Sequence, residues 1–309
     1  MNVLVTGGAG FVGSHLCEGF LAQGWRVRAL DDLSVGRREN VPAGCDLLVG
    51  SVLDDDALAV AMAGMDSVCH EAARVSVRGS LDSYVEDAEI NLVGTLRTLR
   101  AAHRAGVRRF VFASSMAVYA DSAGGTPVDE SHALGPMSPY GITKLAAERE
   151  VLLLGRHLGL ETVSLRYFNA FGPRQTFTPY VGVATIFATR LLAGESITVF
   201  GDGMQTRDFV HVGDIVQANC LALTAPSAGR VIGQVFNVGS GTGTTVLELA
   251  ALLTARLRPG APRSHAPARP EEIRHSVADL TRARRILGYA PQTDLAAQID
   301  EVIASVRTV

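Results

Sequence analysis

The sequence predicts an α/β protein: a Rossmann-like, doubly wound parallel sheet with a smaller C-terminal α/β domain that binds a substrate. In the first half of the chain, short apolar segments alternate with helical patterns, and the first segment runs directly into a glycine-rich turn. Strands that alternate with helices of more than ten residues pair in parallel through right-handed crossovers. After about residue 168, turn-rich stretches separate shorter elements, which predicts the second domain.

The elements of the main sheet follow in order along the chain. Residues 2–6 form a short apolar run, as in a strand buried on both faces, and the glycine turn after them opens a helix that continues through Leu21. The same alternation predicts these further elements: strand 26–30, strand 46–49, helix 54–63, strand 67–71, helix 84–105, strand 109–114, helix 138–159 and strand 162–167.

The predicted boundary between the two domains lies near residue 168. Residues 1–168 form the nucleotide-binding domain, and residues 169–309 form mainly the substrate domain, because Pro- and Gly-rich turns become frequent there. Strands within about 208–240, such as 234–238, are expected to rejoin the main sheet. The boundary is approximate because no clean linker separates the two parts.

Composition excludes several classes of function. The net charge of −3 gives no basic surface for nucleic acid. The sequence contains no run of about 18 uncharged apolar residues, which is the length needed to span a membrane. The cysteines Cys17, Cys45, Cys69 and Cys220 are far apart, without a CxxC pair or a signal peptide, so we expect reduced thiols, no metal site and a cytoplasmic protein.

The glycine-rich turn predicts a dinucleotide site. Gly7, Gly10 and Gly13 stand at three-residue spacing between a strand and a helix. Such glycines allow a tight turn, a close approach of the backbone to a pyrophosphate, and close packing of helix on strand. A bare glycine motif also fits a simple helix-entry turn. The acidic pair Asp31 and Asp32, at the end of the second strand, falls where an acid binds the adenosine ribose.

The charge of Asp31 favours NAD over NADP, because a carboxylate repels the 2′-phosphate of NADP. Arg37 and Arg38 lie nearby and would accommodate that phosphate, but an acid at the strand end weighs more. We therefore expect NAD as the cofactor.

A tyrosine and the only lysine of the chain predict the catalytic site. The 28 basic residues comprise 27 arginines and one lysine, Lys144, which stands four residues after Tyr140 in a predicted helix. A four-residue step puts both side chains on one face, and a nearby ammonium favours the phenolate of a tyrosine. Arginine is bulkier and planar, so the retained lysine indicates a tuned acid–base pair. The alternative is a surface helix with two polar residues.

Ser114 and Ser115 end the strand 109–114 at the carboxyl edge of the sheet, where ligands of such folds bind. A serine there is able to hydrogen-bond a substrate hydroxyl or the oxygen of a keto intermediate. We therefore add Ser115 to Tyr140 and Lys144 as the predicted catalytic residues.

Ten motifs resemble those of one enzyme family. They are the glycine turn, Asp31-Asp32-Leu33-Ser34, His70-Glu71-Ala72-Ala73, residues 91–95, residues 114–119, residues 140–144, Arg166-Tyr167-Phe168-Asn169, residues 172–175, residues 207–212 and residues 236–239. With these motifs the chain resembles the extended short-chain dehydrogenases/reductases of the NAD-dependent epimerase/dehydratase family, and is similar to the UDP-glucose 4-epimerases within it. The resemblance covers almost the whole length.

This resemblance implies a reaction: NAD-dependent epimerisation at C4 of a UDP-sugar, of the UDP-glucose/UDP-galactose type, through a 4-keto intermediate and transient hydride transfer. Tyr140 would take the proton of the 4-hydroxyl and return it. Lys144 would stabilise the phenolate and bind the nicotinamide ribose, and Ser115 would hold the 4-oxygen. The helices 84–105 and 138–159 resemble those that pair across a two-fold axis in this superfamily, which implies a homodimer.

The resemblance also implies the residues that bind each ligand. For NAD they are Gly7, Gly10, Phe11, Val12, Gly13, Asp31, Asp32, Ser51, Val52, Ala72, Ala73, Asn91, Ser114, Tyr140, Lys144 and Tyr167. For the UDP-sugar they are Val77, Ser115, Met116, Asn169, Thr178, Arg207, Arg269 and Ser276. Ser51 replaces an acid that often contacts adenine. Asn169 also fits a turn cap, and Arg269 also fits a solvated loop.

The sugar stays open between three possibilities. The small Ser276, at a position that gates the substrate in the family, would admit the N-acetyl group of UDP-GlcNAc, and Thr178, Arg74 or Arg190 would meet the carboxylate of UDP-glucuronate. A dehydratase is disfavoured because Ser115-Met116-Ala117 contains no carboxylate. A net oxidoreductase that releases its nicotinamide, or a non-catalytic NAD-sensing protein, are further alternatives; the latter has no need of three catalytic residues.

Overall fold

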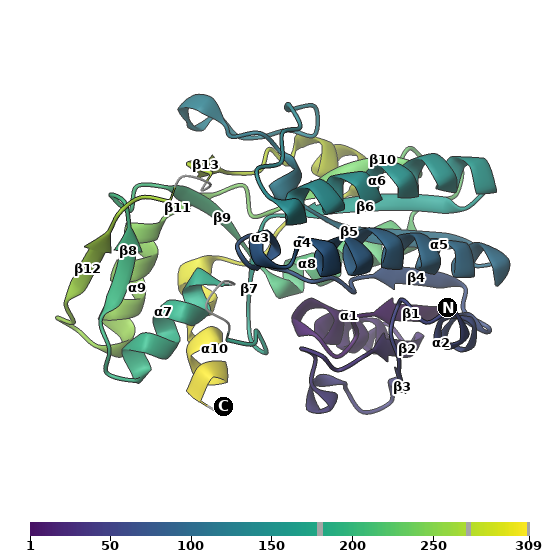
Figure 1. The fold of residues 1–309 in the computed structure, drawn as a ribbon, viewed down its shortest axis with the longest axis horizontal. Helices are drawn as coiled ribbons and strands as arrows, with labels where there is room; N and C mark the ends of the chain where they lie inside the picture. Colours follow the sequence, from purple (N-terminus) through teal and green to yellow (C-terminus); the bar gives the residue numbers. More distant parts are fainter. Residues whose placement is uncertain (178–181, 270–272, 308–309) are drawn as a thin grey trace.

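A seven-stranded parallel sheet forms the centre of the fold, which is described from a computed structural model over residues 1–177, 182–269 and 273–307 (Figure 1). Every neighbouring pair in the order β10-β6-β5-β4-β1-β2-β3 is parallel. The strands are β1 Asn2–Thr6, β2 Arg26–Asp31, β3 Asp46–Val49, β4 Ser67–His70, β5 Arg109–Ser115, β6 Glu161–Tyr167 and β10 Gln234–Val238. The doubly wound sheet predicted from the sequence is confirmed.

Helices cover both faces of this sheet, and β1 shows why. Side chains alternate between the two faces along a strand. Val3 and Val5 therefore belong to the core beneath α1 (Phe11–Ala22) and α8 (Val212–Thr224), whereas Leu4 belongs to the opposite core. The helices of that second face are α2 Asp55–Met62, α5 Thr95–Arg104 and α6 Pro139–Leu158. The strand order reverses between β1 and β4, and ligands of such sheets bind at this switch point.

The helix predicted over residues 84–105 is not a single α-helix. It consists of α4 (Tyr84–Ala88), a π-helical turn (Glu89–Gly94) and α5, and a short α3 (Gly79–Asp82) precedes it. A π-turn widens the helix by one residue and often occurs at a functional site. Apolar periodicity does not reveal it, because one widened turn shifts the pattern by a single position.

A second lobe contains two small sheets and three helices (Figure 1). Its strands are β7 Asn169–Phe171, β8 Ile197–Phe200, β9 Thr206–His211, β11 Gly243–Thr245, β12 Arg263–Ala266 and β13 His275–Ser276. Its helices are α7 Val183–Leu192, α9 Val246–Leu257 and α10 Leu295–Arg307, which share one apolar core. Four short helical turns remain: η1 Arg38–Asn40, η3 Met116–Val118, η4 Ala123–Gly125 and η5 Ala283–Leu287.

The chain passes repeatedly between the lobes. β7 follows β6 directly and pairs with β9 of the second lobe, while β10 returns to the main sheet beside β6, as the sequence suggested for residues 234–238. The carboxyl ends of β6 and β10 therefore lie side by side, and the chain continues from β6 directly into the second lobe. Within the described residues, no helix has the length and apolar character needed to cross a membrane.

Candidate active site

The glycine turn leads the chain from β1 directly into α1. Gly7 has φ +69° and donates to Leu30 O at 2.7 Å, and a Cβ on Gly13 would lie 2.1 Å from Gly7 O. A side chain at Gly13 would therefore force the turn apart. α1 begins after Gly10 without a side-chain cap and without an acidic residue in its first turn. This helix end fits an anionic diphosphate.

Asp31 holds the glycine turn in place. Its Oδ2 accepts from Ala9 N at 2.9 Å and its Oδ1 from Leu33 N at 2.8 Å. Burial raises the pKa of this carboxyl, and the two backbone hydrogen bonds oppose the shift. Asp32 is exposed and accepts from the backbone and hydroxyl of Ser34. Asp31 thus has a structural role at the turn in addition to the predicted contact with ribose.

Further predicted cofactor residues lie in the loops after β3 and β4. A Cβ on Gly7 would lie 2.9 Å from Ala72 N, so the loop after β4 approaches the turn closely. Val52 is buried against Gly94 of the π-turn. Four further predicted residues, Phe11, Val12, Ser51 and Ala73, are half-buried.

The start of α6 places Tyr140 beside Ser115. Ser138 caps the helix by accepting from Gly141 N at 3.1 Å. A Cβ on Gly141 would lie 2.4 Å from Ala117 O, so glycine lets the helix rest on η3, which directly follows Ser115. Ser115 therefore lies close enough to Tyr140 to lower the pKa of its phenol. Two residues distant in the sequence therefore form one site.

The electrostatics of Tyr140 differ from the expectation. Burial raises its pKa to about 12, the nearby hydroxyl of Ser115 lowers it by less, and the charges of Asp87 and Glu71 raise it further. Lys144 lies on the same helix face, but its Nζ donates to Ala113 O at 2.9 Å. Burial is the largest effect on the pKa of Tyr140, and Lys144 is not among the groups that lower it.

Lys144 is itself perturbed. Burial lowers its pKa to about 8, while the charges of Glu71 and Asp87 favour the ammonium. Its Nζ also lies 5.1 Å from the centre of the Phe112 ring. The only lysine of the chain is thus a buried cation beside β5, as expected of a tuned group rather than of a surface residue.

Glu71 is a half-buried acid that the sequence reasoning did not single out. Tyr167 donates from its hydroxyl to Glu71 Oε1 at 2.9 Å, and Asn219 Nδ2 donates to the Tyr167 hydroxyl at 2.7 Å. Burial raises the pKa of Glu71 to about 7, and the hydrogen bond from Tyr167 and the charge of Lys144 oppose the shift. Its position directly after the buried strand β4 is the sequence feature that could have identified Glu71 as a site residue.

Asn91, on the π-turn, holds the loop after β4. Its Oδ1 accepts from Arg74 N at 2.8 Å, and its Nδ2 donates to Arg74 O and to Asp87 Oδ2. Thr143 also donates to Asp87 Oδ2, at 2.9 Å. Asp87 therefore connects this loop, through Asn91, to Thr143 of α6, which directly precedes Lys144. The sequence reasoning did not single out Asp87. The side chains of Arg74 and Val77 in the same loop are exposed.

The side chain of Ser114 points towards the buried ion pair of Glu148 and Arg166. Its Oγ donates to Glu148 Oε2 at 2.7 Å, and Arg166 Nε donates to the same oxygen at 2.9 Å. Glu148 follows Lys144 by one helical turn. The hydroxyl of Ser114 is thus engaged within the core, and this ion pair connects β5, β6 and α6 beside the predicted catalytic residues.

The second lobe gathers predicted substrate residues on one sheet. Asn169 pairs with Phe209, and Ser276 pairs with Arg207, so β7 and β13 both pair with β9. Asn169 Oδ1 and Ser276 Oγ are buried and have no hydrogen-bond partner in the described part of the chain. Buried polar atoms without a partner are rare in folded proteins, and they suit a ligand site.

Arg269 adds a cation to the same lobe. Its guanidinium carbon lies 3.3 Å from the centre of the Phe200 ring. Met116 is half-buried at the start of η3, beside Ser115. Thr178 lies outside the described residues.

Comparisons with known proteins show the family to which the chain is similar. The model of the NAD dependent epimerase/dehydratase family matches residues 3–239. The UDP-glucose 4-epimerase of Mycolicibacterium smegmatis is 38% identical over 310 residues, covering 98% of this chain and 97% of the relative. The structure of the UDP-glucose 4-epimerase of Thermotoga maritima with UDP-glucose has a TM-score of 0.94 and 35% identity, covering 100% of this chain and 99% of that one.

The Thermus thermophilus UDP-glucose 4-epimerase in complex with NAD has a TM-score of 0.91 and 36% identity, covering 99% of each chain. These matches extend over nearly the full length of both proteins, including the glycine turn and the segments that carry Ser115, Tyr140 and Lys144. This chain belongs to the NAD dependent epimerase/dehydratase family.

Proposed function

We propose that this protein is an isomerase, an NAD-dependent 4-epimerase of a UDP-sugar of the UDP-glucose/UDP-galactose type. The observation that carries the proposal is the meeting of Ser115, Tyr140 and Lys144 at the carboxyl end of β5, where α6 rests on η3. The names of the relatives and the absence of a carboxylate in Ser115-Met116-Ala117 favour epimerisation over dehydration.

The three side chains divide the proton chemistry. Tyr140 takes the proton of the 4-hydroxyl and later returns it, and Ser115 holds the 4-oxygen by a hydrogen bond. Lys144 keeps its ammonium below about pH 8, and this charge favours the phenolate over the neutral phenol. When bound, NAD supplies the hydride acceptor and donor at C4 and a further positive charge. Bringing the high pKa of Tyr140 towards neutrality needs these positive charges.

The residues present fit NAD. Gly7, Gly10 and Gly13 form the tight turn before α1, and Phe11 and Val12 begin this helix, whose N-terminal end has no side-chain cap.

At the other end of the cofactor we assign the adenosine ribose to the carboxylate of Asp31, which disfavours the 2′-phosphate of NADP. Asp32, Ser51 and Val52 are proposed neighbours of the adenosine. Ala72, Ala73, Asn91, Ser114, Tyr140, Lys144 and Tyr167 are proposed neighbours of the nicotinamide half.

The second lobe is proposed to bind the UDP-sugar. Arg207 and Arg269 offer charge-assisted hydrogen bonds to the diphosphate. Asn169 and Ser276 each have a buried oxygen without a partner among the described residues, which suits a polar ligand. Val77 and Met116 are proposed contacts on the main-sheet side. Because Ser276 is small, a UDP-GlcNAc 4-epimerase is the second candidate.

The function is tested by incubating the purified protein separately with UDP-glucose, UDP-GlcNAc and UDP-glucuronate, and following the anomeric protons by NMR. We expect UDP-glucose to equilibrate with UDP-galactose without net formation of NADH. If only another UDP-sugar equilibrates with its C4 epimer, that sugar is the substrate. For UDP-glucuronate, the exposed Arg74 is the residue proposed to bind the carboxylate. A stoichiometric gain of NADH absorbance without any C4 epimer would contradict the proposal and indicate an oxidoreductase.

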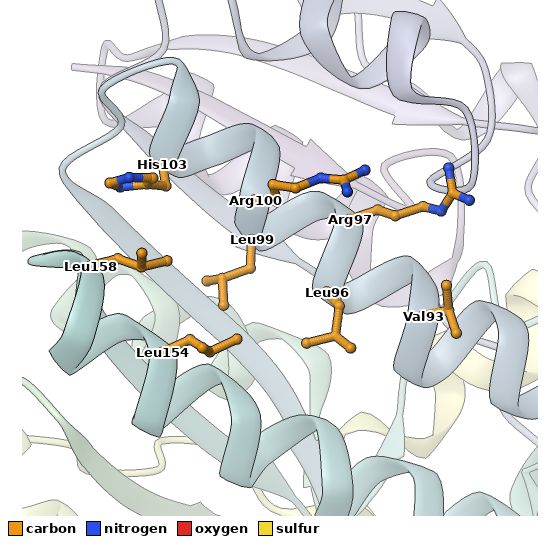
Figure 2. A pocket seen from close by; sticks show the side chains of 8 residues that line it. All are labelled: Val93, Leu96, Arg97, Leu99, Arg100, His103, Leu154 and Leu158. Atoms are coloured by element: carbon orange, nitrogen blue, oxygen red, sulfur yellow. The ribbon is translucent and has the colours of Figure 1, made fainter.

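A second copy of the chain is the proposed partner of an apolar face on α5 and α6. Figure 2 shows a groove between these helices, at the end of α6 far from Tyr140. It is lined by Val93, Leu96, Leu99, Leu154 and Leu158, with Arg97, Arg100 and His103 along one side. Val93 and Leu153 are large apolar residues exposed to 42% and 63% on these neighbouring helical segments. Such a continuous apolar face is typical of an interface.

We expect Leu153→Arg to separate the dimer into monomers, because two buried guanidinium groups would face each other across the axis without a counter-charge. Sedimentation velocity measures this as a change from twice the chain mass of 32.6 kDa to that mass itself. Val60→Arg, at an exposed apolar residue on α2, is the control and should leave the dimer intact. A wild-type protein that sediments as a monomer would contradict the dimer.

We further propose the division into a nucleotide-binding domain (1–168, with strands from about 208–240) and a substrate domain (mainly 169–309). The separate apolar core shared by α7, α9 and α10 supports it. The cytoplasmic location stays a prediction from the sequence.

A further inference from the structure

Glu71 is a half-buried acid without a role in the proposed reaction. It directly follows β4, whose last residue, His70, pairs with Phe112 of β5. The Glu71 N–H still donates to Thr6 O of β1 at 3.2 Å, so the backbone continues along the sheet for one more residue. This register places Glu71 beside Ala113, the residue of β5 that follows Phe112.

Lys144 reaches the same residue of β5 from α6. Its Nζ donates to Ala113 O at 2.9 Å, and its side chain is buried. Glu71 lies towards the other face of the sheet, because its partner Tyr167 is bonded to Asn219 of α8, and α8 covers the face opposite α6. The acid and the ammonium thus lie at one point of β5, on its two sides. Two charges that are shielded from water in this way influence each other strongly.

The hydrogen bonds around Tyr167 decide which way its hydroxyl points. Asn219 is fully buried, and its Nδ2 donates to Ile215 O at 2.9 Å and to the Tyr167 hydroxyl at 2.7 Å. A backbone carbonyl only accepts, so this end of the amide is its NH2 group. The hydroxyl of Tyr167 therefore accepts from Asn219 and gives its own proton to Glu71 Oε1, at 2.9 Å. An ionised carboxylate is the stronger acceptor of such a bond, so this network favours the charged form of Glu71.

The charges that favour the Lys144 ammonium are those of Glu71 and Asp87, and Glu71 has the larger effect. The other titratable groups around this pair are neutral near pH 7 or bound in an ion pair. They are His70, whose pKa burial lowers to about 3, Tyr140, whose pKa burial raises to about 12, Cys69 and Tyr167, whose pKa values burial raises, and Glu148 with its partner Arg166. Glu71 is therefore the main counter-charge of Lys144.

The inference rests on the proposed function, in which the Lys144 ammonium favours the phenolate of Tyr140. We propose that Glu71 is a positioning residue of this acid–base pair: its carboxylate, oriented by Tyr167, holds a proton on Lys144 at the pH where the pair acts. Burial lowers the pKa of Lys144, and the charge of Glu71 opposes this shift, which leaves the pKa at about 8. Glu71 has a pKa of about 7, so it is ionised in the pH range in which Lys144 begins to lose its proton.

The single lysine of the chain allows a direct test, because labelled lysine gives one Cε signal, that of Lys144. The chemical shift of this signal, followed by NMR in the NAD-loaded protein as the pH is raised, reports the ammonium itself and needs no substrate. Glu71→Gln keeps the shape of the side chain and an oxygen that accepts from Tyr167, but not the charge. We expect it to lower the midpoint of the Lys144 titration by about one pH unit, as for the loss of one nearby opposite charge.

Two further variants separate the charge from the fold. Glu71→Asp keeps a carboxylate, so its midpoint should stay nearer to that of wild type than the midpoint of Glu71→Gln does. Glu130→Gln is the matched control. Glu130 is also a half-buried acid whose pKa is raised by burial, and it accepts from Asn237 N at 2.8 Å, but it is not among the charges that affect Lys144. Its replacement should leave the Lys144 midpoint unchanged.

The pH profile of kcat is the second readout. At acid pH Lys144 is charged in both proteins, so Glu71→Gln should turn over at nearly the rate of wild type. On the alkaline side its kcat should be about tenfold lower, because a shift of one pH unit changes the charged fraction of Lys144 by that factor. A purely structural defect would instead lower kcat at every pH.

A Lys144 midpoint that does not move in Glu71→Gln, or that moves equally in Glu71→Asp, would overturn the inference. A loss of kcat that is the same at every pH would also overturn it. If the Lys144 titration shifts as expected but wild type epimerises no UDP-sugar, the proposed function is wrong and the effect of Glu71 on Lys144 stands.

Discussion

Tyr140→Phe is expected to reduce the rate of 4-epimerisation by at least about a thousandfold, within the range that general acid–base catalysis contributes. The phenyl ring fills the same buried space but has no proton to exchange with the 4-hydroxyl. The variant should retain its bound NAD, because the glycine turn and Asp31 are untouched. Initial rates, together with the nucleotide released on denaturation, measure both effects.

Tyr289→Phe is the matched control for the loss of a buried tyrosine hydroxyl. Tyr289 donates to Gly239 O at 2.7 Å and lies outside the proposed active site. Its removal should lower the stability of the fold by about 1–3 kcal/mol and leave the catalytic rate near that of wild type. An active Tyr140→Phe protein would refute the assignment of this residue as the acid–base group.

Lys144→Arg is expected to lower kcat by about a hundredfold, although the positive charge is kept. The larger guanidinium would shift the charge away from the position that the ammonium occupies beside Tyr140. Lys144 is 3% exposed, and its Nζ lies between Ala113 O and the Phe112 ring. A planar guanidinium is larger than this site and would push against β5, at a cost of about 1–3 kcal/mol for an overpacked core. Steady-state rates and thermal unfolding measure the two effects.

The pH dependence distinguishes the charge from the fit. The Lys144 ammonium, with a pKa of about 8, loses its proton as the pH rises through that value, so wild-type activity should decline there. Arginine stays charged, so the residual activity of the variant should not decline in this range. The control is Arg149→Lys, an exposed position on the same helix that should behave like wild type. A Lys144→Arg enzyme of full activity would make the single lysine an accident of composition.

Most of the main sheet was predictable from the sequence because its signals are local. The strand over residues 2–6 has the predicted bounds, and α6 lies between the residues Ser138 and Gly159 that cap it. An apolar run, a capping serine and a left-handed glycine each act within a few residues of chain. The motifs of the proposed active site are also short, so the sequence predicts which residue types form the site but not how they are arranged in space.

The electrostatics were not predictable in the same way. From the spacing of Tyr140 and Lys144 one expects a phenol with a lowered pKa, but the structure raises that pKa to about 12. Desolvation depends on every group packed around the hydroxyl, and the charges of Glu71 and Asp87 reach the site from other elements. No spacing rule contains these contributions.

The sequence by itself determined the doubly wound sheet, the glycine turn, and the tyrosine and single lysine on one helix face, because these follow from short-range periodicity and backbone sterics. Only the tertiary structure decided the π-turn that directs Asn91 to the loop after β4 and the half-buried Glu71–Tyr167 pair. It also decided that the Gln205 Oε1 has no hydrogen-bond partner among the described residues. Whether a polar atom has a partner depends on residues far apart in the chain. That information exists only once the chain is folded.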